Sequence, residues 1–233
     1  YDDEDSLVAK RKEQVTGAEV RLGQQIARLG TVSAALVTEE MEYTHEGDPT
    51  VRERFGLRAL ELETLVETFD RVPFPQSGKK HFFALQLAGR FFGGDVEYTR
   101  FFTSVEAYFP MGEYLTYHPK VALGLSAPDL PWSEKFYMGG MDSFAGYRTH
   151  QLSGDKMLLV SNEMRLRLPL RLYLSMRYDI GNAFGSADEI KFETLHHGAG
   201  VFLSLDSPVG PFEVGYGAND DTERFYLRAG FDF

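Results

Sequence analysis

Apolar and polar residues alternate along most of this chain, and the alternation is clearest at its C-terminal end. From Phe225 to Phe233 every second residue is apolar. Arg224, Tyr226 and Arg228 belong to the opposite set. A period of two is that of a β-strand with one apolar and one polar face. This segment therefore predicts a strand that separates an apolar from a polar environment.

The same period of two recurs in about eleven segments, which clusters of Gly, Pro, Asn and Asp separate. They are residues 18–29, 31–43, 57–69, 81–91, 97–109, 114–125, 156–168, 171–180, 197–205, 211–217 and 223–233. In one of them Leu172, Leu174 and Met176 share a face, and Arg177 and Asp179 lie on the other. The pattern predicts an all-β protein built from antiparallel strands.

Two architectures share this pattern, a soluble β-sandwich and a transmembrane β-barrel. Short connections at 169–170 and 207–210 alternate with long ones at 126–155 and 182–196, which is typical of outer-membrane barrels. No run of about 18 apolar residues is present, so no transmembrane helix is predicted. We therefore expect a transmembrane antiparallel β-barrel over residues 17–233, with a long loop at about 126–155 and a polar extension at 1–16.

Composition narrows the class of partner. The net charge of −11 argues against nucleic acid as a partner, and the absence of cysteine fits an outer-membrane protein. The 19 Phe and 12 Tyr residues suit the aromatic girdles of a barrel surrounded by outer-membrane lipid or lipopolysaccharide. The histidines show no metal-ligand spacing, and neither Ser143 nor Ser161 lies in a nucleophile elbow. We expect no catalytic residue, metal or cofactor.

Five motifs in a fixed order resemble those of one family of outer-membrane barrels. They are Asp-Arg-Val-Pro-Phe-Pro-Gln-Ser-Gly at 70–78, the Gly-rich segment 136–148, Glu163-Met164-Arg165 with Pro169, the segment 178–182, and 207–211 with Tyr216-Gly217. Together they span roughly residues 55–233. This part of the chain resembles the bacterial surface-antigen superfamily, which includes assembly factors of the BamA and TamA type, two-partner-secretion transporters and the barrel part of patatin-like autotransported proteins.

The resemblance implies a bacterial outer-membrane location, a role in protein insertion, translocation or passenger export, and a set of site residues. The implied signature loop comprises Gly139, Gly140, Ser143, Ala145, Gly146, Tyr147 and Arg148. The implied network inside the lumen comprises Glu163, Arg165, Arg177, Asp179 and Gly181. The implied C-terminal signal comprises Phe231 and Phe233.

One departure from the family pattern concerns the loop. The family carries an arginine immediately before Gly-Tyr, and this arginine pairs with the aspartate that corresponds to Asp179. Here the position holds Ala145, which cannot make a charge-assisted hydrogen bond with its side chain. Arg148, Arg177, Arg165 and Arg167 are then the candidate partners of Asp179.

The other departure concerns length. The resemblance implies a barrel of the 16-strand type, of which this chain would supply the C-terminal part with about 10–12 strands. An open sheet edge in lipid is unfavourable, so the remaining strands would come from elsewhere, and another subunit completing the barrel is one source. A passive pore, a membrane anchor for an upstream lipase domain and a soluble sandwich remain alternatives to the insertion or export role.

Overall fold

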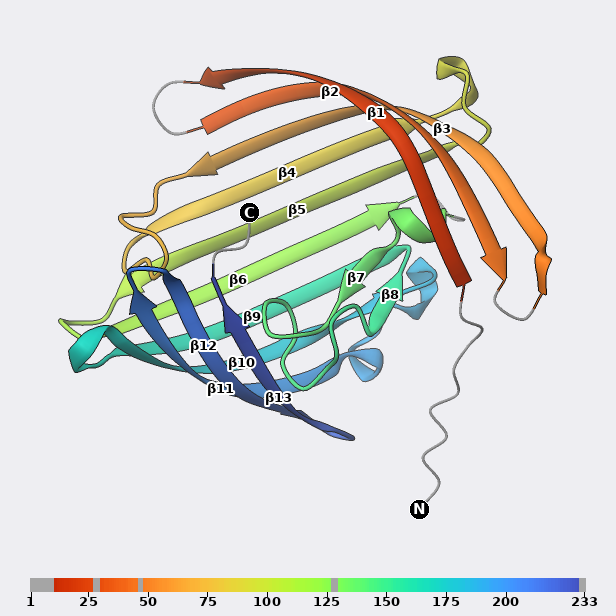
Figure 1. The fold of residues 1–233 in the computed structure, drawn as a ribbon. Helices are drawn as coiled ribbons and strands as arrows, with labels where there is room; N and C mark the ends of the chain where they lie inside the picture. Colours follow the sequence, from red (N-terminus) through yellow and green to blue (C-terminus); the bar gives the residue numbers. More distant parts are fainter. Residues whose placement is uncertain (1–10, 27–29, 46–47, 127–129, 231–233) are drawn as a thin grey trace.

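The computed structural model describes residues 11–26, 30–45, 48–126 and 130–230, and it shows a strongly curved antiparallel sheet (Figure 1). Eleven strands form this sheet in the order β1-β2-β3-β4-β5-β6-β9-β10-β11-β12-β13. Their bounds are β1 Arg11–Ile26, β2 Gly30–His45, β3 Asp48–Glu67, β4 Gly78–Ala88, β5 Tyr98–Pro110, β6 Leu115–Ser126, β9 Lys156–Arg167, β10 Leu172–Phe184, β11 His196–Ser207, β12 Gly210–Asn219 and β13 Glu223–Ala229. The all-β antiparallel prediction is confirmed.

The outer, convex face of the sheet is apolar. Phe225 is 86% exposed and Leu227 is 79% exposed, and Met176 is exposed on β10. Residues of the opposite parity, such as Ser161 and Asp179, are buried on the concave face. A soluble sandwich would bury the apolar set, so this distribution fits a sheet whose outer face contacts lipid.

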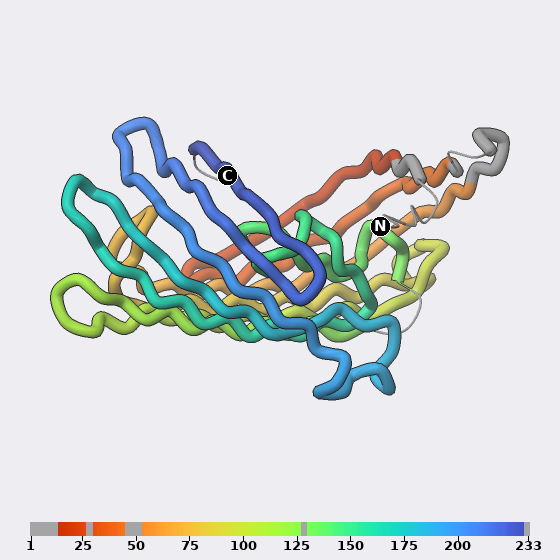
Figure 2. Tube along the Cα trace, turned by 90° about the horizontal axis from the view of Figure 1, so that it is seen from below, coloured from red at the N-terminus to blue at the C-terminus, as the bar shows by residue number. Residues whose placement is uncertain are grey.

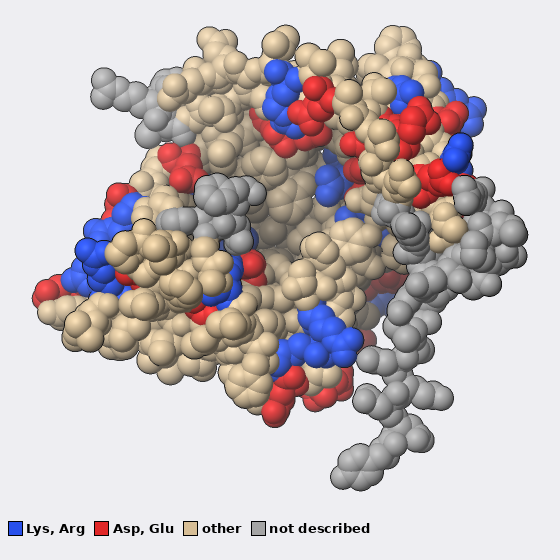
Figure 3. Space-filling view, viewed as in Figure 1, with Lys and Arg blue, Asp and Glu red and all other residues tan. Residues whose placement is uncertain are grey.

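Both ends of the sheet curve to the same side (Figure 2), and the space-filling view shows a hollow with charged side chains around it (Figure 3). Among the described strands, β1 pairs only with β2 and β13 pairs only with β12. The sheet is therefore a barrel wall with two free edges. No helix in the described part of the chain is long and apolar enough to cross a membrane.

Two predicted boundaries are wrong. β1 begins at Arg11, so residues 11–16 belong to the sheet and not to a polar extension. β3 begins at Asp48, nine residues before the predicted start at position 57. In both cases most successive residues of the segment are polar, so the sequence shows no alternation there. Cross-strand pairs such as Arg54–Glu42 support the extended ends.

The connection after β6 folds back into the hollow instead of lying outside it. We call residues 130–155 the inserted loop. Within it, the short strands β7 (Phe136–Met138) and β8 (Leu152–Gly154) pair as a separate hairpin. Phe136 and Met138 are buried in an apolar cluster with side chains from the concave face of β2 and β3, such as Met41 and Leu57. Phe136 is therefore a loop anchor and not part of an outer aromatic girdle.

Candidate functional site

The tip of the inserted loop, residues 139–147, lies on the concave face of β10–β13 (Figure 1). Gly139, Gly140 and Gly146 have φ values of 124°, 92° and 86°, which only glycine adopts without strain. Ser143 closes the tip, because its Oγ donates to the carbonyl of Gly139 and accepts from the Gly139 N–H, both at 2.8 Å. The loop therefore has one defined shape inside the hollow.

The carboxylate of Asp179 on β10 is the centre of the contact between wall and loop. Its side chain is 0% exposed and accepts three hydrogen bonds. Oδ2 accepts from the Ala145 backbone N–H at 2.9 Å and from Arg177 Nε at 2.9 Å, and Oδ1 accepts from Ser161 Oγ at 2.5 Å. Arg177 also donates from Nη1 to the carbonyl of Met141 at 2.6 Å. Of the four candidate arginines, Arg177 is the one that pairs with Asp179.

Ala145 fits against a floor of two glycines, Gly200 on β11 and Gly217 on β12. A Cβ built at Gly200 would come within 3.1 Å of the Ala145 methyl, and one at Gly217 within 3.3 Å. Ala145 is fully buried, so its side chain has no free volume in which to extend. An arginine at this position would have to lift the loop from the wall. The small side chain of Ala145 and the two glycines beneath it therefore fit each other, and a larger residue at position 145 would not fit this floor.

The last hairpin, β12–β13, makes a second set of contacts with the tip. The hydroxyl of Tyr226 accepts from the Gly146 N–H at 2.8 Å and donates to the carbonyl of Tyr147 at 2.9 Å. The carbonyl of Gly146 accepts from Thr222 Oγ1 at 2.9 Å and from Asn219 Nδ2 at 3.2 Å. These bonds join residues 73–80 positions apart in the chain. In addition, Arg228 bridges Asp142 of the tip and Glu213 of β12.

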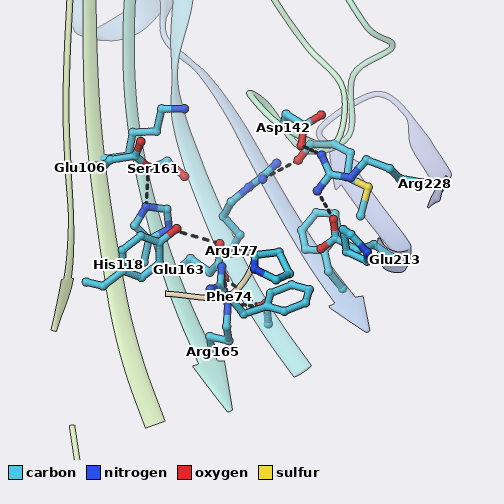
Figure 4. Close-up of a pocket in the computed structure, with 17 residues that line it drawn as sticks. Phe74, Glu106, His118, Asp142, Ser161, Glu163, Arg165, Arg177, Glu213 and Arg228 are labelled. Atoms are coloured by element: carbon cyan, nitrogen blue, oxygen red, sulfur yellow. Dashed lines mark hydrogen bonds and ion pairs between the residues drawn. The ribbon is translucent and has the colours of Figure 1, made fainter. Parts of the chain in front are cut away.

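A second polar cluster lies deeper in the hollow, on β5, β6 and β9 (Figure 4). His118 Nε2 is 2.9 Å from Glu106 Oε2, and His118 Nδ1 is 3.5 Å from Glu163 Oε2. Glu163 also pairs with Arg165 at 2.8 Å and accepts from Ser175 Oγ at 2.8 Å. Charges withdrawn from bulk water need such partners, and here they connect neighbouring strands across the wall.

The connection between β3 and β4, residues 68–77, covers the hollow from the other rim. Phe74 is buried there, stacked on Tyr173 at 4.4 Å, and the guanidinium of Arg165 lies 5.6 Å from its ring centre. Asp70 closes this turn by accepting from the backbone N–H groups of Gln76 and Ser77 at 2.8 and 3.0 Å. Partial burial alone would raise the pKa of Asp70, but these two bonds and Arg71 outweigh it and lower the pKa.

Between the tip and this turn lies a cavity of about 360 Å³. Its lining carries carboxylates and cations in balance, as Figure 4 shows. They are Glu106, Asp142, Glu163 and Glu213, with Lys120, Arg165, Arg177 and Arg228. No group of three or more His, Cys, Asp or Glu residues among the described positions has the geometry to hold a metal ion. The cavity is a charge-balanced, polar interior.

Comparison with known proteins agrees with this geometry. The model of the Omp85 superfamily domain matches residues 2–233. The chain belongs to the Omp85 superfamily. This membership confirms the resemblance drawn from the motifs, and with the exposed apolar outer face it places the protein in the bacterial outer membrane.

Among related Omp85 proteins is the outer membrane protein assembly factor BamA of Nitratidesulfovibrio vulgaris, 26% identical over 157 residues, which are 60% of this chain and 20% of that protein. BamA from Haemophilus ducreyi lacking POTRA domains 1–3 has a similar fold, with a TM-score of 0.80, 15% identity, and coverage of 93% of this chain and 53% of that one. CdiB from Acinetobacter baumannii follows with a TM-score of 0.67, 15% identity, and coverage of 91% and 40%. The chain thus spans about half of these structures or less.

The structure brings most of the sequence-predicted residues into one region. Gly181 follows Asp179 on the same face of β10, where a Cβ would collide with the backbone of β9. Tyr147 is buried beside Phe144, whereas Arg148 is exposed, and its backbone N–H donates to Gln151 Oε1. The predicted signal residues Phe231 and Phe233 lie outside the described residues.

Several residues of the site were not predicted as such from the sequence. They are Phe74, Glu106, His118, Asp142, Glu213, Tyr226 and Arg228. The alternation of apolar and polar residues places the strand residues among them on the polar face, and this was the signal that the sequence offered. The alternation does not show which loop a residue on that face contacts.

Proposed function

We propose that this chain forms the gating wall of an outer-membrane barrel that inserts or translocates other proteins. Its working parts are the free edge of β13 and the inserted loop. β13 pairs with β12 on one side, and no described strand occupies its other side. Such an edge presents backbone N–H and C=O groups to which a client strand can add. This free edge beside an inserted loop is the observation that carries the proposal.

The partners follow from the two faces of the sheet. The exposed apolar side chains of the convex face, such as Leu203 and Phe225, would contact lipid acyl chains. The client or passenger is an unfolded protein segment, bound through its backbone. Pairing and release of strands require no bond-making chemistry, so the function needs no catalytic residue or cofactor.

Closure of the wall needs more strands. Unpaired backbone groups at the edges of β1 and β13 would be costly in lipid. Further strands of a longer chain, or a second subunit, would supply partners for these edges at rest. A seam formed at β13 would then be weaker than the continuous ladders within the sheet, and would open when a client arrives.

The test uses the full natural protein in liposomes of outer-membrane lipid. A denatured outer-membrane protein is added, and its folding is followed by its protection from protease. Deletion of residues 134–150 should abolish the acceleration of client folding, because the loop then no longer sets the position of the wall. Deletion of residues 186–194, in the exposed connection between β10 and β11, is the matched control.

Two results would contradict the proposal. Unchanged client folding after the loop deletion would show that the loop has no part in insertion. A steady conductance in planar bilayers without any effect on clients would indicate a passive pore. Surface display of a passenger fused to the same chain, with no activity on separate clients, would restrict the function to export.

A further inference from the structure

The loop tip is held more extensively by the last hairpin than by β10. From β10 and its neighbours the tip receives two hydrogen bonds, Ala145 N–H to Asp179 and Arg177 to the Met141 carbonyl. From β12–β13 it receives the four hydrogen bonds of Tyr226, Thr222 and Asn219, together with the ion pair of Arg228. Most of the described polar contacts of the tip are therefore with the end of the sheet that carries a free edge.

Tyr226 is central to this set. Its hydroxyl both accepts from and donates to the tip, at the Gly146 N–H and the Tyr147 carbonyl, so it holds the backbone of two consecutive residues. Its ring packs near Phe202 at a centroid distance of 6.3 Å, which fixes the direction of the hydroxyl. Gly146 has no room to adjust, because a Cβ there would lie 2.5 Å from the backbone of Ala218.

We propose that Tyr226 is a positioning residue that latches the inserted loop to the edge strand β13. In this chain the family's arginine is replaced by Ala145, and Arg177 pairs with Asp179 within the same strand. The charge pair of Asp179 therefore stays within the wall, and the ion pair that crosses from loop to wall, Asp142–Arg228, lies on the last hairpin together with the bonds of Tyr226. Since the bonds are shared, displacement of β13 frees the loop, and a held loop restrains β13 by the same free energy.

This inference rests on the proposed function in that it concerns the same loop and edge. Its test, however, measures the position of the loop and not client insertion, so the two can fail separately. The variant Tyr226→Phe keeps the ring and removes both hydrogen bonds. The matched control is Tyr178→Phe, which removes a hydroxyl from the outer face of the sheet, where it contacts His197.

Trypsin cleavage after Arg148 reports release of the loop in the folded protein, because the backbone at this residue is held by hydrogen bonds to the Gln151 side chain and backbone and must leave this conformation to enter the protease. Loss of the two hydrogen bonds should raise the cleavage rate about tenfold in Tyr226→Phe and leave it unchanged in Tyr178→Phe. Thr222→Val, which removes another bond to Gly146, should raise the rate further when combined with Tyr226→Phe. The far-UV circular dichroism melt of the sheet should stay the same, which separates a latch from a general role in stability.

Rescue provides a second measurement. The chain contains no cysteine, so the pair Asp142→Cys and Arg228→Cys can be joined selectively by a short bismaleimide. In the Tyr226→Phe background the cross-link should restore protection of Arg148. If Tyr226→Phe is cleaved at the wild-type rate while Asp179→Asn is cleaved rapidly, the latch lies on β10 and the proposal is wrong. A lowered melt of the whole sheet in Tyr226→Phe would overturn it as well.

Discussion

Removal of the Asp179 carboxylate should release the loop tip before the sheet unfolds. In Asp179→Ala three donors lose their acceptor: the Ala145 N–H, the Ser161 hydroxyl and the Arg177 guanidinium. A stranded buried donor costs about 1–3 kcal/mol, and removal of one member of a buried ion pair costs about 3–5 kcal/mol. Because the serine hydroxyl can rotate to another acceptor, we expect the free energy that attaches the loop tip to the wall to fall by about 3–5 kcal/mol in total.

Asp179→Asn should weaken the attachment of the loop much less than Asp179→Ala does. Its amide oxygen can take the place of Oδ2 and accept from both Ala145 and Arg177, while its amide nitrogen donates to Ser161. The shape and the number of hydrogen bonds are kept, and the loss is the charge assistance, about 1–2 kcal/mol. The expected order of loop attachment is therefore wild type, then Asp179→Asn, then Asp179→Ala.

The chain supplies its own reporter for this measurement. Trp132 is the single tryptophan, it lies in the inserted loop, and its side chain is stacked with Lys135 at 4.7 Å. In urea titrations of the detergent-solubilised protein, tryptophan fluorescence follows the loop and far-UV circular dichroism follows the sheet. The Trp132 transition of Asp179→Ala should move to lower urea while the sheet transition moves little. Asp206→Ala, on the concave face at the other end of β11, is the control.

Coincident Trp132 transitions in wild type and Asp179→Ala would refute the assignment of Asp179 as an anchor of the loop. Equal losses in Asp179→Asn and Asp179→Ala would show that the charge, and not the acceptor geometry, holds the tip.

Three other changes test the outer face and the opposite rim. Met176→Arg should destabilise the protein in bilayers by about 2–4 kcal/mol in urea unfolding, as expected for a charge on a lipid-facing position, whereas Glu193→Arg in an exposed connection should be neutral. Phe74→Ala should cost about 3–5 kcal/mol in the same assay, because the ring fills a buried site against Tyr173. The lowered pKa of Asp70 means that its contribution to stability is complete above the ordinary aspartate pKa of about 3.9 and is lost as the pH falls through the lowered value. The protection factors for hydrogen exchange of residues 68–79 should therefore fall at acidic pH in the wild type, and Asp70→Ala, which removes the acceptor of the Gln76 and Ser77 N–H groups, should show low protection factors at every pH.

The sequence predicted the strands wherever one face is apolar and the other polar. The segment 156–168 became β9 at 156–167, and the segment 171–180 became β10 at 172–184. The prediction failed where this contrast is lost, as at the start of β3, because alternation reports the lipid boundary and not the hydrogen-bonded ladder. The parts of a strand that extend beyond the apolar band show no alternation of apolar and polar residues, so the sequence does not indicate them.

The site was predictable in part for a related reason. Parity and motif order indicated Asp179 and the Gly-rich segment, but four arginines remained candidates for the partner. Arg177 pairs with Asp179 because it lies two residues away on the same face of β10, while Arg148 lies outside on the exposed stretch after the tip. The path of an aperiodic loop depends on contacts such as Gly146–Tyr226, 80 positions apart, which no local pattern encodes.

The glycine floor beneath Ala145 has a consequence for how such barrels diverge. An arginine restored at position 145 alone would have to extend from a buried site against Gly200 and Gly217, while Arg177 still holds the tip at the Met141 carbonyl. The two locking schemes are therefore mutually exclusive, and passage from one to the other requires coordinated replacements on three strands and the loop. A homologue with arginine at this position should carry a different residue at position 177, so the pair should covary.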